Sequence, residues 1–213
     1  MPGLAEGPGT SFCMLTQLAT VKARLEIAAS DPSNDELLTR AIEAVSARFD
    51  RECNRTLARA VGATEEFAAA DTEIIPSCYP IEAVTKFELK TSEGEGWIEQ
   101  AEAKWLVRGG CVISLGAPLS FAPRFAWMSP VLARVIYTGG FVLPGTAPGA
   151  GQTALPADLE SAAIEQVAAW FQQRDKVGLM RYWPSGGTFL VFAQLPLLAQ
   201  VSASLRPHQR WTV

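Results

Sequence analysis

Two stretches near the start of the chain carry apolar residues at every third or fourth position, the spacing of one helical face. Leu18, Val21 and Leu25 predict a first helix over residues 15–29. A longer helix is predicted over residues 34–57. Its apolar face consists of Leu38, Ile42, Val45, Phe49 and Cys53.

The start of the second helix carries a capping signature. Ser33 and Glu36 match the S-x-x-E box, in which each side chain satisfies a free amide of the first turn. Thr16 is a candidate cap for the first helix. The carboxylates of this region are therefore interpreted as helix caps and solvated charges, and not as an acid–base pair.

After the second helix the period of the apolar pattern changes to two. In TKFELK, Phe87 and Leu89 alternate with charged residues, as in a strand with one face toward water. KWLVRGGCVISL predicts a hairpin, because Gly109 and Gly110 can adopt the positive φ angles of a two-residue turn. VLARVIYTGG predicts a further strand. A β insert is therefore expected over residues 63–141.

Residues 142–155 are rich in Pro and Gly and predict a linker, because neither a helix nor a sheet ladder accommodates such a stretch. A third helix is predicted over residues 156–175, since the missing N–H of Pro156 suits a first turn. Its apolar face consists of Leu159, Ala163, Val167, Trp170 and Phe171. A last helix is expected to start near Pro196 and to stop before Pro207.

These elements predict an α+β fold within one domain of 213 residues. Two N-terminal helices and the third helix form a helical bundle core, accompanied by a small antiparallel β subdomain and an extended C-terminal tail. Residues 1–13 lack a basic segment and a continuous apolar run, so they predict a flexible arm and not a signal peptide. Residues 14–179 are expected to form the domain, and residues 180–213 the tail.

The composition is that of a folded globular protein, with 48% hydrophobic and 19% charged residues. A net charge of −4 argues against binding of nucleic acid through phosphate contacts. The longest apolar stretch, residues 188–201, is interrupted by Pro196 and is too short to span a bilayer, so no membrane partner is expected. The four cysteines are widely spaced and accompany a single histidine. We therefore expect no metal, no disulfide framework and no cofactor.

Charge is distributed unevenly along the chain. No acidic residue follows Asp175, whereas four of the 18 basic residues do, which gives this end a charge of +4. The rest of the chain holds 14 basic and 22 acidic residues, a balance of −8. The basic end also contains the aromatic residues Tyr182, Trp183, Phe189, Phe192 and Trp211. Such an end predicts a docking segment for another protein, or alternatively a strap that packs back on its own subunit.

The order of these phrases resembles that of a known family. LTQLATVKARLEI and SNDELLTRAIEAVSARFDRECNR are followed by YPIEAVTKFEL and VIYTGGF, then by LPADLESAAIEQVAAWFQQRDKVGL and LPLLAQVSASLRPHQRW. Taken together over about residues 14–210, they are similar to the head-tail connector, or adaptor, proteins of long-tailed bacteriophages and gene transfer agents. The long β insert and the Pro- and Gly-rich linker depart from the shortest family members.

The resemblance implies a structural protein of the virion neck, made in the host cytoplasm. It implies a homo-oligomeric ring, usually of twelve subunits, between the capsid portal protein and a stopper or tail-completion protein. Double-stranded DNA would pass through this ring without specific binding, which suits an acidic body. By position, the family's portal-docking segment falls at about Leu195 to Trp211. The predicted partner interface consists of Trp183, Phe189, Phe192, Leu195, Leu198, Arg206, His208, Arg210 and Trp211.

Other functions find less support in the residues. A histidine-assisted nucleophile is disfavoured, because the only histidine, His208, lies near the chain end. GPGTS at residues 7–11 lacks the lysine of a phosphate-binding loop. Two alternatives remain open. One is a stopper or tail-completion protein of the neck, and the other is a small-molecule binding module with a cage of Trp97, Trp105 and Trp127.

Overall fold

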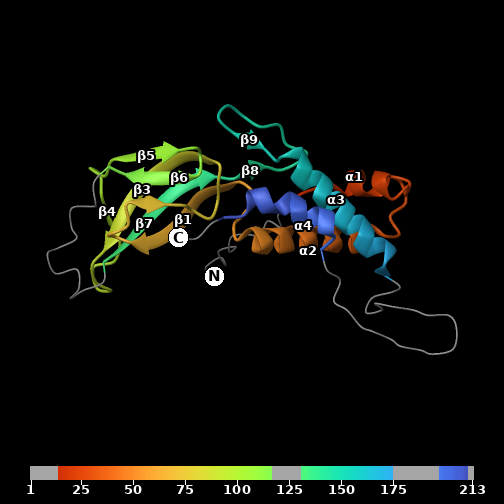
Figure 1. Ribbon diagram of the computed structural model, residues 1–213, viewed down its shortest axis with the longest axis horizontal. Helices are drawn as coiled ribbons and strands as arrows, with labels where there is room; N and C mark the ends of the chain where they lie inside the picture. The colour runs from red at the N-terminus through yellow and green to blue at the C-terminus, as the bar shows by residue number, and fades with distance from the viewer. Residues whose placement is uncertain (1–13, 117–130, 175–196, 211–213) are drawn as a thin grey trace, which may run out of the picture.

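The computed structural model describes residues 14–116, 131–174 and 197–210. Helices gather at one end of an elongated molecule and the β-sheets at the other (Figure 1). Each end has its own hydrophobic core. The fold is therefore α+β, as the sequence predicts.

The helical core is built by four helices. They are α1 (Leu18–Arg24), α2 (Asp35–Cys53), α3 (Ala157–Gln172) and α4 (Ala199–Leu205). Helix α3 packs against each of the other three. The apolar stripe of α2 is buried as its spacing predicts, and the helix ends at Asn54, whose φ of 50° lies in the left-handed region. The predicted ranges 15–29 and 34–57 thus contain the helices but extend beyond their ends.

Neither predicted helix cap is formed. Asn34 is the N-cap residue of α2, without a side-chain cap bond, and Gln17 is that of α1. Ser33 instead donates its backbone N–H and its hydroxyl to Oδ1 of Asp31, at 3.0 and 2.6 Å. The capping-box prediction was wrong, because α2 begins one residue later than the box requires, with Asn34 as N-cap, and the Ser33 side chain bonds to Asp31.

The β region contains two antiparallel sheets. A four-stranded sheet has the order β1-β7-β3-β4, and a three-stranded sheet has the order β2-β6-β5. Their strands are β1 (Ala60–Ala68), β2 (Glu73–Ile74), β3 (Ile81–Lys90), β4 (Ile98–Glu99), β5 (Trp105–Arg108), β6 (Val112–Leu115) and β7 (Leu132–Gly139). Phe87, Leu89, Val135 and Tyr137 are buried between the sheets and their loops.

Two details of the predicted strands differ from the structure. Gly109 and Gly110 have the expected positive φ angles, 56° and 68°, but Arg108 pairs with Val112, so the turn has three residues. Glu88, expected to face water, is buried. It is buried because Arg134 lies directly opposite on β7 and forms an ion pair with it.

The two regions are joined where the predicted linker begins. Strands β8 (Phe141–Val142) and β9 (Thr153–Ala154) form a short parallel pair before α3, so residues 142–155 include some ordered pairing. Gly139 and Gly140 bring the end of β7 against the backbone at Cys78 and Ala58, where any Cβ atom would lie within 2.6 Å of a carbonyl oxygen. This close approach packs the end of β7 against the segment that follows α2.

Candidate assembly interfaces

The described part of the C-terminal tail folds onto its own chain. Val201 and Leu205 of α4 are fully buried in the helical core. The backbone N–H of Leu198 donates to Oε1 of Gln166 on α3, at 2.9 Å. Over residues 197–210 the tail is therefore not extended, and the strap alternative describes it.

Two charged contacts fasten the end of this segment. After α4 comes the short 3-10 helix η2 (Arg206–His208), where Nε2 of His208 lies 3.0 Å from Oδ2 of Asp158 on α3. One guanidinium nitrogen of Arg210 lies 2.6 Å from Oε1 of Glu65 on β1. Desolvation raises the pKa of Asp158, but the hydrogen bond and the charge of His208 outweigh it and hold this pKa below its ordinary value.

The structure therefore divides the predicted partner interface. Leu198, His208 and Arg210 contact residues of their own subunit. Arg206 is exposed, and no ion pair of its side chain is found within the described residues. The remaining positions, Trp183, Phe189, Phe192, Leu195 and Trp211, lie outside the described residues. Their role in binding a partner stays a prediction.

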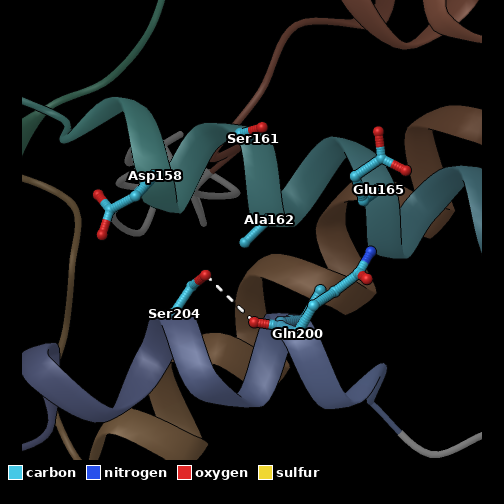
Figure 2. Close-up of a pocket in the computed structure, with 7 residues that line it drawn as sticks. Asp158, Ser161, Ala162, Glu165, Gln200 and Ser204 are labelled. Atoms are coloured by element: carbon cyan, nitrogen blue, oxygen red, sulfur yellow. Dashed lines mark hydrogen bonds between the residues drawn. The ribbon is translucent and has the colours of Figure 1, made fainter.

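A shallow groove of about 300 Å³ runs between α3 and α4 (Figure 2). Asp158, Ser161 and Glu165 of α3 lie across from Gln200 and Ser204 of α4. The hydroxyl of Ser204 donates to the backbone oxygen of Gln200 at 3.2 Å, and Glu165 forms an ion pair with Arg24 at 2.7 Å. Both carboxylates of this groove are thus paired within the subunit, Asp158 with His208 and Glu165 with Arg24.

An apolar edge on the β region is a second candidate interface. Strand β5 is the outer strand of the three-stranded sheet, and Leu106 and Val107 are 71% and 41% exposed. Successive strand residues point to opposite faces, so both faces of this edge present apolar side chains to water. Within the described residues β5 pairs on one side only, and an unpaired edge strand is a template for pairing with another chain. The sequence analysis missed it, although the unbroken run of apolar residues in WLVR is its signal.

The tryptophans proposed as a cage have separate partners. Trp97 lies over the guanidinium of Arg134, at 4.3 Å, and Trp105 packs against the ring of Phe87 at 5.2 Å. Trp127 lies outside the described residues. The two described tryptophans thus contribute to the surface and the core of the β region.

The described residues assemble no group of three or more His, Cys, Asp or Glu side chains that could hold a metal ion. Burial raises the pKa of Cys53 to about 11, which disfavours its nucleophilic thiolate. Among the helices described, none is sufficiently long and apolar to cross a membrane.

Comparison with known proteins supports the fold. No family model matches the chain, and no curated protein does. Among solved structures, a chain from the neck of an empty gene transfer agent particle, computed with C6 symmetry, is similar with a TM-score of 0.53 and 17% identity. The match covers 99% of this chain and 95% of that one.

A chain from the neck of the native particle, computed with C12 symmetry, is similar with a TM-score of 0.50 and 18% identity, over 100% of this chain and 97% of that one. At these identities the likeness is one of fold. The fold expected from the order of the sequence phrases is thus shared with chains from the neck of gene transfer agent particles.

Proposed function

We propose that this chain is a structural protein of the neck of a gene transfer agent or long-tailed phage particle. The observation that carries the proposal is the shared fold, which extends over 95% and 97% of the two neck chains. Because the match includes both the helical and the β region, it is not a likeness of one common motif. The virion neck is accordingly the proposed location, and the proposed role is structural and not enzymatic.

Within the neck we assign the chain the position of the head-tail adaptor, a ring of copies between the portal and the stopper. The two similar neck structures were computed with C6 and C12 symmetry, which supports a ring. A ring requires a heterologous contact, in which one surface of a subunit meets a different surface of the next. The exposed edge of β5, with Leu106 and Val107, is the surface we assign to the neighbouring copy.

The same arrangement accounts for the charge of the chain. Duplex DNA binds proteins through phosphate contacts with clustered lysine and arginine. A net charge of −4 disfavours such adhesion and suits a passage through which DNA slides. Double-stranded DNA is therefore a passing cargo in this proposal, and not a specific ligand.

The portal contact is assigned to the basic C-terminal end. Arg206 projects from η2 into solvent and is the described residue of the predicted interface that is free to meet a partner. Arg and Trp are frequent anchors of protein interfaces, which supports a contribution from Trp183 and Trp211. In this proposal α4 stays on its own subunit and presents the end of the tail to the portal.

Mixing the purified full chain with portal protein tests the assignment. An adaptor binds portal directly, whereas a stopper requires the adaptor first, so absence of binding to portal alone contradicts the adaptor position.

Arg206→Glu should weaken portal binding by about tenfold, the loss of one charge-assisted contact. Arg40→Glu, an exposed change on α2, is the matched control and should leave the affinity unchanged. Truncation after residue 194 is not a suitable test of the portal contact, because it also removes Val201 and Leu205, which belong to the helical core.

A further inference from the structure

A hollow of about 400 Å³ lies where the end of α2, the β region and the C-terminal segment meet. Three arginines line it: Arg51 from the last turn of α2, Arg55 just beyond that helix, and Arg210 from the C-terminal segment. Thr56 and Ser77 add hydroxyl groups to the same lining. The hollow thus gathers hydrogen-bond donors from three separate parts of an acidic chain.

Arg55 is the most buried of the three, with an exposed fraction of 5%. Its guanidinium lies 3.2 Å above the centre of the Tyr79 ring and donates to the backbone oxygen of Tyr79. Burial lowers its pKa, because the charged form loses hydration. Its Nε atom has no hydrogen-bond partner within the described residues. A buried cation with an unused donor is costly unless something compensates it.

Arg210, whose side chain is 18% exposed, also lines the hollow. One of its terminal nitrogens pairs with Glu65, but within the described residues its Nε atom also has no hydrogen-bond partner. The second oxygen of Glu65 is already used, since it accepts the backbone N–H of Ser77 at 3.0 Å. Both oxygens of Glu65 therefore have partners, one in Arg210 and the other in Ser77.

The other nearby carboxylate is Asp50, which also lines the hollow. Its Oδ1 atom accepts the backbone N–H of Leu57 at 2.9 Å. Burial raises its pKa, against the opposing effects of this hydrogen bond and of the charge of Arg55. Three guanidinium groups thus accompany two carboxylates, Asp50 and Glu65, of which Glu65 already pairs with Arg210, so the cluster holds one more positive than negative group.

We propose that this hollow binds a small oxyanion, either a phosphate or a carboxylate group. Arginine forks and hydroxyl groups are the donors that such anions accept from, and paired forks favour planar or tetrahedral oxyanions over chloride. A bound anion would join the end of α2 to the C-terminal segment. A free anion is favoured over the backbone of duplex DNA, since the net charge of the chain is −4. The proposal goes beyond the neck role and stands independently of it.

Titration of the full chain with sodium phosphate, at constant ionic strength against sodium chloride, tests the site by amide NMR. We expect saturable shifts concentrated at Asn54, Thr56, Ser77 and Arg210. Arg51→Gln should raise the dissociation constant by about tenfold, because it removes one charge-assisted hydrogen bond from an exposed side chain that folding does not require. Arg40→Gln, on the opposite end of α2, should leave the constant unchanged. Arg55→Lys serves as a second variant, which keeps the charge and loses the fork.

Further arms of the experiment identify the source of the anion. Saturable shifts of the same amides with sodium acetate support a carboxylate ligand, and a clear preference for inorganic phosphate supports a phosphate ligand. A short DNA duplex that displaces phosphate from these amides at lower concentration would overturn the small-ligand assignment in favour of nucleic acid. Shifts that do not saturate, or that are equal in Arg51→Gln and the unmodified chain, would overturn the site itself.

Discussion

The helical region and the β region treat their apolar side chains differently. In the helical region the apolar stripes of α2 and α3 are covered by each other and by α4, and Leu37 of α2 is exposed outside this core. In the β region the core between the sheets is closed, but Leu106 and Val107 of β5 and Ile98 of β4 are left exposed on outer strands. The difference suggests that the helices stabilise the subunit, whereas the sheet edges are available to a neighbour.

The strongest way to break this comparison is to remove an anchor of α4. Leu205→Ala should lower the free energy of unfolding by about 2–5 kcal/mol, because it leaves a cavity in a fully buried site. Leu37→Ala, an exposed leucine on α2, is the matched control and should change it by less than about 0.5 kcal/mol. Chemical denaturation measures both. Equal, small losses would mean that the C-terminal helix is not part of the core.

The closed interior of the β region is tested at Glu88. Its carboxylate is buried and bonded to Lys86 and Arg134, and these hydrogen bonds hold its pKa below the ordinary value, chiefly through that of Lys86. Glu88→Gln should cost about 1–3 kcal/mol at neutral pH. Glu99→Gln, at the exposed edge strand β4, should cost less than about 0.5 kcal/mol.

The pH dependence of this effect has a definite sign. Because the folded-state pKa of Glu88 is depressed, its contribution is present above the unfolded pKa and is lost as the pH falls through the folded one. Unfolding measured from pH 7 down to pH 3 should therefore show the unmodified chain and Glu88→Gln converging in acid. A constant difference across this range would contradict the ion-pair account.

The open edge is tested by placing a charge on it. Leu106→Glu should leave the free energy of unfolding within about 0.5 kcal/mol, because the side chain is exposed. It should weaken association between copies on purified portal by about tenfold or more, since burying an unpaired carboxylate is costly. Leu37→Glu makes the same change on the helical region and should leave association intact. Sedimentation of the assembled complexes distinguishes the two, and equal effects would remove the distinction between the regions.

Periodicity predicted the elements of both regions well, because each apolar stripe depends only on residues close in sequence. The stripe of α2 from Leu38 to Cys53 is buried as predicted, and so is Phe87 on β3. The burial of Glu88 could not be predicted, since its partner Arg134 comes from a strand 46 residues later. Long-range pairing decides which polar residues leave the solvent.

The candidate interface shows the same limit. The acid-free tail predicts a docking segment or a strap on its own subunit, but counting charges cannot tell whether the partners of its basic residues belong to the same chain. For His208 and Arg210 they do: Asp158 and Glu65 lie 50 and 145 residues away in sequence. The spacing of Val201 and Leu205 likewise predicts an apolar face without saying what covers it.

The smallest expected effect concerns the ion pair between Asp158 and His208. Asp158→Asn should lower the free energy of unfolding by no more than about 0.5 kcal/mol, because the Asp158 side chain is 51% exposed and solvent screens the pair. The pKa of Asp158 is depressed, so this difference should be present above its unfolded pKa and vanish as the pH falls through the folded value. Denaturation at pH 6 and pH 3 measures it. A loss comparable to that of Leu205→Ala would mean that charge, and not apolar burial, holds the C-terminal segment on the helical region.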